Sequence, residues 1–215
     1  QGSKVKINFI NKTDHDQTIH PHGLRLDYHS DGIPGISQKS AVKPDESFTY
    51  EFTFPDVGLF WYHPHVREDY TQQMGLYGNF LVRPKQKDFY EPVNKELILT
   101  LDDILLGKDV EHFYKGFTNY AAMGRYGNVM LLNNDPKYST QVNKGDVVRF
   151  FITNTANTRT FNFKIQNAKI KVISGDDSKF EHEFFSDGII IAPGERIIAD
   201  IVFEKSGKQK ILNSI

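Results

Sequence analysis

Two histidine-rich segments constrain this sequence more than any other feature. The first is Thr18-Ile19-His20-Pro21-His22-Gly23 and the second is Phe60-Trp61-Tyr62-His63-Pro64-His65. A strand alternates its side chains between two faces, so each His-x-His sends both imidazoles to the same side. Two such strands side by side would aim four neutral imidazoles at one point, and imidazole is a favoured ligand of copper, zinc, nickel and iron. The sequence therefore predicts a metal site built from His20, His22, His63 and His65.

Chance does not readily produce this pattern. With 8 histidines in 215 residues, about 0.3 His-x-His tripeptides are expected before proline is required between them, and short motifs carry such false positives. The alternative is that the segments are two unrelated histidine pairs on solvated strand ends. We favour the metal site.

The absence of cysteine narrows the chemistry further. It removes disulfides, zinc–thiolate sites, iron–sulfur clusters and cysteine nucleophiles. It also removes a blue-copper centre, because that trigonal site needs a thiolate beside two imidazoles.

Charge and hydropathy exclude two classes of partner. The net charge of −1 provides no broad electrostatic basis for binding nucleic acid or an anionic membrane. No apolar run approaches the roughly 20 residues that a membrane helix needs. The first residues do not read as a signal peptide, so they do not indicate a compartment.

The hydrophobic pattern predicts many short strands and no convincing amphipathic helix. Together with 13% aromatic residues, this favours an all-β fold of sandwiches or barrels. We expect one domain over 1–84, a linker rich in proline and charge over 85–95, and a second domain over 96–215. The expected strands are 5–10, 47–54, 59–63, 76–82, 97–101, 129–132, 146–152, 161–165, 189–191 and 197–203.

An internal repeat supports the two-domain arrangement. When Asn11 is set against Asn154, residues 5–10 lie over 148–153, and His20 and His22 fall on Phe163 and Ile165. When Pro44 is set against Pro193, His63 and His65 fall on Leu212 and Ser214. All four candidate ligands are lost in the second copy, so the imidazoles have a role beyond folding. The alternative is that any two β domains align passably.

The repeat also suggests that each domain lacks an edge. The second copy carries about 45 residues of strands before its counterpart of residues 5–10, and the first copy has a closing strand that the second lacks. Exposed strand edges invite pairing or aggregation. We therefore expect a fragment of a longer chain, or a chain whose partner supplies the remaining strands.

These segments resemble the multicopper oxidases, the group of laccases and metallo-oxidases. The paired His-x-His motifs are highly specific for that family, whereas the segments of the second domain are moderately so. The resemblance runs over nearly the whole chain. The matching segments are 18–24, 31–32, 58–65 and 75–78 in the first domain, and 147–150, 159–163 and 191–196 in the second.

The resemblance implies cupredoxin-like Greek-key domains and copper as the cofactor. In the family, a blue copper takes electrons from a reducing substrate and passes them to a trinuclear cluster, where dioxygen is reduced to water. Carried over by motif, His20 would bind the type 2 copper, and His22, His63 and His65 would bind the type 3 pair.

Asp31 is the one catalytic candidate, because it stands where the family keeps a carboxylate near the cluster. The resemblance implies that it positions ligands and delivers protons. The alternative, that Asp31-Gly32 is an ordinary turn, stays open. We favour a core position for Trp61 over a wall of the metal site, and a solvated turn for Glu68-Asp69.

One part of the family pattern is missing. The family's last domain, with its cysteine motif and two further His-x-His pairs, is absent from these residues. We therefore expect the type 1 copper, and half of the cluster ligands, in a third cupredoxin domain or partner chain, and no laccase activity from this chain alone. By resemblance, the other partners are dioxygen and a phenolic or metal-ion reductant, and the location is secreted or periplasmic.

Other functions compete with this hypothesis. One is a non-catalytic metal-binding or scaffold module on the same domains. A copper-free structural relative is disfavoured because all four ligand positions are retained. A two-domain nitrite reductase is disfavoured because it needs the missing cysteine.

Overall fold

The computed structural model describes residues 1–109, 118 and 122–214, and the chain divides into two compact units, Gln1–Lys85 and Gln86–Ile215. Both units are built from strands, which confirms the predicted all-β fold. Their sheets are open and sandwich-like rather than closed barrels. The boundaries and the linker expected from the sequence stay predictions, although residues 86–95 are grouped with the second unit.

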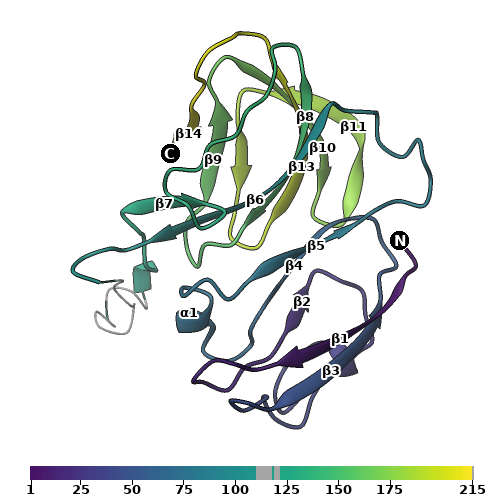
Figure 1. The fold of residues 1–215 in the computed structure, drawn as a ribbon, viewed down its shortest axis with the longest axis vertical. Coiled ribbons are helices and arrows are strands. Elements are labelled where there is room, and N and C mark those ends of the chain that lie inside the picture. Colours follow the sequence, from purple (N-terminus) through teal and green to yellow (C-terminus); the bar gives the residue numbers. More distant parts are fainter. Residues whose placement is uncertain (110–117, 119–121, 215) are drawn as a thin grey trace. The chain divides into compact units, whose positions relative to one another are not determined.

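The first unit contains two small sheets (Figure 1). In one, β1 (Lys4–Ile10) pairs antiparallel with β3 (Ser47–Thr53). In the other, the order is β2 (His20–His22), β4 (Gly58–His63) and β5 (Gly78–Val82), and both pairings are antiparallel. The short helices are η1 (Tyr28–Ser30) and α1 (Glu68–Thr71).

Period-two alternation explains the core of the first unit. Tyr50 and Phe52 of β3 are buried while their neighbours in the strand are more exposed, so one face of β3 is turned inward. Phe60 of β4 and Val82 of β5 join them in one hydrophobic cluster. The faces of β4 therefore differ, because Phe60 belongs to this cluster whereas Leu59 and Trp61, although buried, do not.

The second unit has a six-stranded and a three-stranded sheet. In the larger, the order is β11-β10-β13-β8-β6-β7, and β6 and β8 are the one parallel pair among the described strands. The smaller has the order β12-β9-β14. The strands are β6 (Lys95–Ile104), β7 (Val129–Leu132), β8 (Val147–Asn154), β9 (Phe161–Ile165), β10 (Ala168–Gly175), β11 (Ser178–Ser186), β12 (Ile189–Ile191), β13 (Arg196–Phe203) and β14 (Ile211–Asn213).

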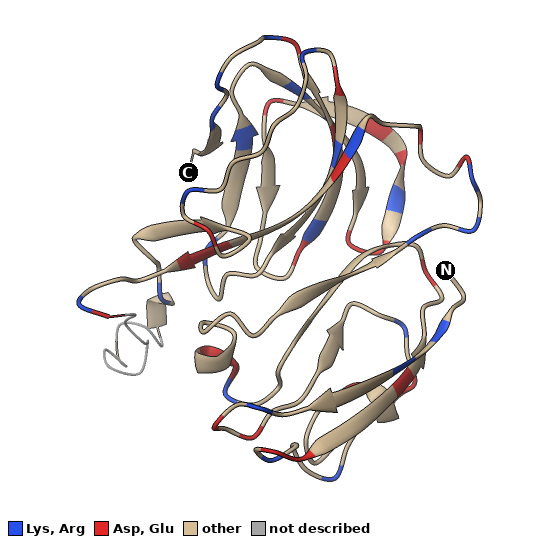
Figure 2. Ribbon diagram, in the orientation of Figure 1, with Lys and Arg blue, Asp and Glu red and all other residues tan. Residues whose placement is uncertain are grey.

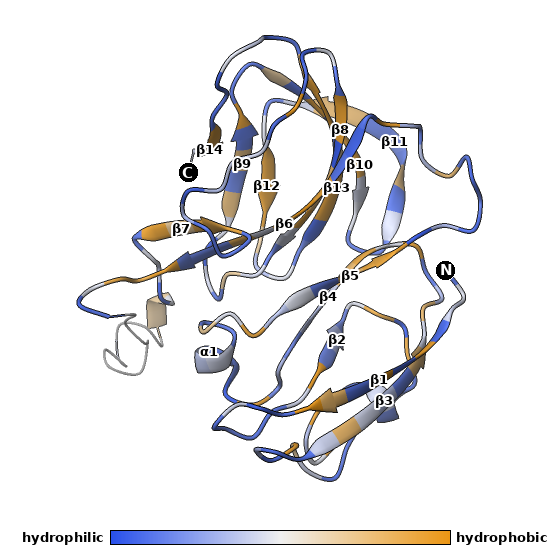
Figure 3. Cartoon of the chain, viewed as in Figure 1, coloured by the Kyte–Doolittle hydropathy of each residue, from blue (hydrophilic) through white to orange (hydrophobic). Residues whose placement is uncertain are grey.

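One hydrophobic cluster fills the space between these sheets. Strands β8, β9 and β13 contribute most of its aromatic and branched side chains, and Figure 3 shows the hydrophobic colour concentrated along the strands. Burial of this apolar surface is the main driving force for folding of the unit. Among the described helices, none is long and apolar enough to cross a membrane.

The strand ladders reproduce most of the internal repeat. Setting Asn11 against Asn154 is an offset of 143 residues, which carries Lys4 onto Val147. Setting Pro44 against Pro193 is an offset of 149 residues, which carries Thr53 onto Val202. In the structure Lys4 pairs with Thr53, and Val147 pairs with Val202. The offset of 149 therefore holds at Thr53, but it is one residue too small at His63. Asn213, not Leu212, pairs with Phe163 in the way that His63 pairs with His20.

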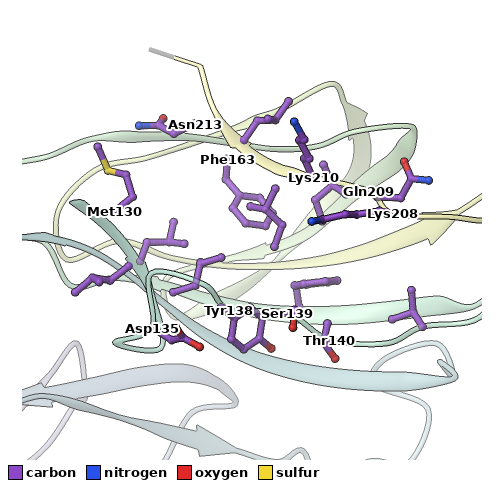
Figure 4. A pocket seen from close by; sticks show the side chains of 18 of the residues that line it. Met130, Asp135, Tyr138, Ser139, Thr140, Phe163, Lys208, Gln209, Lys210 and Asn213 are labelled. Atoms are coloured by element: carbon purple, nitrogen blue, oxygen red, sulfur yellow. The ribbon is translucent and has the colours of Figure 1, made fainter. Parts of the chain in front are cut away.

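A cavity of about 980 Å³ opens in the second unit (Figure 4). It is bordered by β7 and β14, which are edge strands of the two sheets. In the first unit, β5 covers the corresponding edge of β4, whereas no described strand pairs with the outer edge of β14. The residues that line the cavity include core aromatics such as Phe163 and the basic residues Lys208 and Lys210, and no histidine of the described part of the unit is among them.

A buried ion pair joins β8 to β13. Arg149 and Asp200 face each other in the ladder, and the guanidinium donates two hydrogen bonds of 2.8 Å to the carboxylate. Arg149 also donates to the carbonyl of Glu91 at 2.8 Å and lies over the ring of Tyr90 at 4.8 Å. Figure 2 shows such charged positions within strands of this unit as well as in loops. The side chains of Arg149 and Asp200 are 4% and 5% exposed.

Removing either Arg149 or Asp200 should therefore destabilise the second unit. We expect Asp200→Ala to lower the free energy of unfolding of the second unit by about 3–5 kcal/mol, because the guanidinium of Arg149 stays buried without its carboxylate. Hydrogen exchange of the β8 and β13 amides measures the loss. Glu204→Ala, which breaks the exposed pair with Lys169, is the control and should have no resolvable effect. Equal effects of the two variants would contradict the prediction.

Candidate metal centre

The pairing of β2 with β4 brings the two His-Pro-His segments together. His20 lies directly opposite His63, and His22 lies opposite Trp61. Because side chains alternate along a strand, His20 and His22 share one face of β2, and Trp61 and His63 share one face of β4. His65 follows β4, and its backbone N–H donates to Oγ1 of Thr18 at 2.9 Å, which ties this end of the motif beside the start of the first one.

The four imidazoles converge. The candidate ligand atoms of His20, His22 and His63 lie within 4.8 Å of one another. The ring of His65 lies 4.5 Å from that of His20 and 5.5 Å from that of His63, between ring centroids. The sequence prediction that these rings share one site is therefore consistent with the geometry, while their role as metal ligands stays a prediction.

Three of the rings are held through Nδ1. That of His20 lies 2.8 Å from the carbonyl oxygen of Asp31, that of His63 lies 2.9 Å from the carbonyl oxygen of Pro64, and that of His65 contacts the carboxylate of Glu68. A carbonyl oxygen can only accept a hydrogen bond, so Nδ1 of His20 and His63 carries the proton in the neutral ring. Nε2 of these two rings then carries a lone pair and no proton, which is the form that binds metals.

His22 is oriented differently. Its Nδ1 lies 3.2 Å from Nε2 of His63, so this nitrogen faces the other rings. The centre therefore presents Nδ1 from His22 and Nε2 from His63 toward each other. A bound cation would replace this close approach of two nitrogen atoms by coordination.

Burial keeps the central imidazoles neutral. Desolvation is the largest effect on His63, which is 5% exposed, and lowers its pKa to about 3. Desolvation also lowers the pKa of His20, and the carbonyl and carboxylate of Asp31 partly oppose it. Both rings are thus neutral at neutral pH, with no proton on Nε2, and a metal ion would not have to displace a proton from that atom.

Asp31 lies beside His20, where the family resemblance places it, and its catalytic role stays a prediction. Its carbonyl oxygen accepts from His20, and its Oδ1 lies 3.2 Å from the same Nδ1. Gly32, with φ of +72°, makes this approach possible, because a Cβ at that position would overlap the carbonyl oxygen of Ile19. The Asp-Gly turn and the contact with His20 are therefore parts of the same local structure.

Trp61 lies against the imidazoles. Its ring centroid is 4.9 Å from that of His22 and 4.5 Å from that of His63, and Trp61 is not part of the apolar cluster that contains Phe60. Trp61 is 2% exposed, so it has the buried position that the sequence favoured, and it also packs against the imidazoles on that face of β4. The period-two alternation of Trp61 and His63 was the signal for this placement.

Comparisons with known proteins agree with this geometry. Two protein-family models, both described as multicopper oxidase, match this chain over residues 1–87 and 87–209. The second model by itself covers more than half of the sequence. The chain belongs to the multicopper oxidase family.

Individual relatives extend well beyond the matched region. A multicopper oxidase of Staphylococcus aureus is 28% identical over 100% of this chain and 48% of its own length. Laccase-7 of Arabidopsis thaliana is 26% identical over 96% of this chain and 38% of its own length. The crystal structure of a multicopper oxidase from Pseudomonas thermotolerans matches with a TM-score of 0.88 and 30% identity, over 99% of this chain and 52% of that one. This multicopper oxidase chain thus spans about half the length, or less, of these relatives.

Glu68 is the residue at this centre that sequence analysis missed. The expected solvated turn is the short helix α1, and Figure 2 shows its acidic residues in red. Glu68 contacts Nδ1 of His65 three residues earlier. The sequence carried no sufficient signal for this contact, because His65 precedes α1 and the left-handed backbone of Arg67 lies between the two residues.

Gly32 and Gly35 offer a matched test of the turn beside His20. Both have positive φ, +72° and +76°, but a Cβ on Gly35 would meet nothing within 4 Å. We expect Gly35→Ala to destabilise the first unit by about 1–2 kcal/mol, from the left-handed backbone alone. Gly32→Ala should cost about 1–3 kcal/mol more, because Ile19 must move. Urea unfolding followed by fluorescence of Trp61, the single tryptophan, measures both; equal losses would contradict the assigned steric clash.

The lowered pKa of His63 predicts a pH dependence in the metal-free chain. His63 in the unfolded chain takes up a proton below about pH 6.5, whereas folded His63 does so only near pH 3. Keeping His63 neutral therefore costs no stability above about pH 6.5. As the pH falls from there toward 3, it lowers the free energy of unfolding by up to about 1.4 kcal/mol per pH unit. Urea unfolding followed by Trp61 fluorescence between pH 7 and 4 should show a shallower slope for His63→Asn. Parallel slopes for the two proteins would show that His63 is not held neutral.

Proposed function

We propose that this chain supplies half of the trinuclear copper site of a multicopper oxidase that reduces dioxygen to water with electrons from a reducing substrate. The observation that carries the proposal is the convergence of the imidazoles of His20, His22, His63 and His65 in one unit. A neutral all-imidazole donor set suits copper. The membership of the chain in the multicopper oxidase family supports the same assignment.

The donor atoms fit such a site. Nε2 of His20, His63 and His65 and Nδ1 of His22 would hold copper, with His20 on the type 2 ion and the other three on the type 3 pair. Bound copper would supply the one-electron chemistry that reduction of dioxygen requires. The chain has no cysteine, so the type 1 copper and the remaining ligands would come from a third cupredoxin domain or a partner chain.

The residues of this chain would perform three tasks. Burial holds His20 and His63 neutral, so their nitrogen lone pairs are ready at neutral pH. Trp61 covers one side of His22 and His63 and excludes water there. Asp31 orients His20 through its carbonyl oxygen, and its carboxylate, 3.2 Å from Nδ1, would deliver protons at the edge of the site.

The remaining partners belong to the same proposal. Dioxygen is the oxidant, and the reducing substrate is a phenol or a metal ion. The relatives include both a laccase of Arabidopsis thaliana and an iron transport multicopper oxidase of Gibberella zeae. A secreted or periplasmic location is proposed from the family resemblance.

A non-catalytic metal-binding module is the second candidate. The observation in its favour is that one unit by itself brings three donor atoms within 4.8 Å, which is close enough for a single ion. Such a module would bind metal tightly without the rest of the oxidase and would consume no dioxygen.

Copper content and oxygen consumption test the proposal. We expect the purified 215-residue chain to oxidise neither a phenol nor Fe²⁺, and the full-length parent protein to consume dioxygen with one of them. In the parent, His63→Gln should lower the copper bound per protein and abolish oxygen consumption. His182→Gln, at an exposed position on β11, is the matched control and should change neither.

Two outcomes would contradict the proposal. Tight copper binding by the 215-residue chain, combined with no oxygen consumption by the parent protein, would favour the non-catalytic module. Turnover of a phenol by the purified chain, free of any longer species, would show that the missing ligands are not required.

A further inference from the structure

His65 lies in a less regular setting than the other three imidazoles. It follows Pro64 beyond the end of β4, and its side chain is 28% exposed. The Nδ1 atoms of His20 and His63 are held by backbone carbonyls, whereas Nδ1 of His65 contacts the carboxylate of Glu68. The orientation of this ring therefore depends on a side chain that can be replaced without changing the backbone.

The backbone turns back on itself between His65 and Glu68. Arg67 has φ of 49° and ψ of 52°, in the left-handed region that residues other than glycine rarely adopt. This residue is the N-cap of α1, and the helix begins at Glu68. The left-handed turn thus places the first residue of α1 next to the last histidine of the motif. A backbone outlier of this kind persists only where the surroundings hold it, and such outliers cluster at functional sites.

Several contacts hold the turn. The guanidinium of Arg67 donates to both carboxylate oxygens of Asp69, at 2.9–3.3 Å. Oγ1 of Thr71 donates to the carbonyls of Val66 and Arg67, at 3.0 Å each. Tyr70 stacks on His15 with 5.5 Å between ring centroids, which fixes the helix against the rest of the unit. Glu68 is left to contact His65.

We propose that Glu68 is a positioning residue for His65, which it holds in the tautomer with the proton on Nδ1 and the lone pair of Nε2 facing the other imidazoles. The inference rests on the proposed copper site and identifies a further residue of that site. An ionised carboxylate only accepts hydrogen bonds, so the nitrogen that contacts it must carry the proton. A carboxylate on the far nitrogen of a ligating histidine also raises the basicity of the ligand.

The tautomer of His65 can be observed directly in the metal-free chain. In the ¹⁵N-histidine-labelled 215-residue chain at about pH 8, long-range ¹H–¹⁵N correlation spectra distinguish protonated from unprotonated ring nitrogens. The signals of His65 are assigned by their loss in His65→Gln. We expect the proton of His65 on Nδ1 in the unsubstituted chain, and a shift of population toward the Nε2–H tautomer in Glu68→Ala.

Two further variants separate positioning from general effects. Glu68→Gln keeps an oxygen that can accept from Nδ1–H, so the tautomer should be retained. Glu51→Ala removes the same charge from the same unit, but Glu51 pairs with Lys6 at an exposed position away from this turn, so the tautomer of His65 should again be retained. His20 and His63 serve as internal controls, because backbone carbonyls should keep their protons on Nδ1 in all of these variants.

Metal affinity gives a second measurement. In the full-length parent protein, Glu68→Ala should weaken copper binding by about 10–100-fold, as is typical when a partner of a ligating histidine is removed. Glu68→Gln should weaken it less. The inference is overturned if His65 keeps its tautomer in Glu68→Ala. It is also overturned if the signals of His20, His63 and His65 all change together because the unit unfolds. The tautomer is read without metal, so failure of the copper proposal is distinguishable from failure of this one.

Discussion

The antiparallel pairing of β2 with β4 is the interaction on which the centre depends. It sets His20 opposite His63, and the alternation of each strand then brings His22 and Trp61 to the same place. A shift of this register by one residue would turn the imidazoles of one strand to the opposite face. The Asp31-Gly32 turn and the hydrogen bond from His65 to Thr18 tie the flanking segments to the same pair of strands.

The orientation of the imidazole rings is set separately from their placement, by oxygen atoms that accept hydrogen bonds from the rings. The carbonyls of Asp31 and Pro64 fix the tautomers of His20 and His63, and burial keeps both rings neutral. These atoms are supplied by residues next to the motifs in the sequence or in the turn beside them. The segments that carry the ligands therefore also carry much of what orients them, which is consistent with a site that is formed before metal binds.

The second unit shows that the fold and the site are separable. Its β8–β13 ladder has the register of the β1–β3 ladder, and its β9–β14 pair stands in the place of β2 and β4. Phe163 and Ile165 replace the first two imidazoles, and their side chains belong to the core of that unit. The same arrangement of strands is thus stabilised by hydrocarbon in one unit and presents imidazoles in the other, so the arrangement itself does not require histidines.

The sequence alone determined the all-β class, most of the strands, the repeat and the pairing of the His-x-His motifs, because period-two alternation and short motifs are local properties of the chain. It did not reveal the β10–β11 hairpin, the one-residue shift at Asn213 or the contact of Glu68 with His65. These depend on how strands pair and on the left-handed backbone of Arg67, which bring together atoms that sequence order does not relate. Only the tertiary structure could decide them, because register and ring orientation are set by contacts between segments rather than by the composition of any one segment.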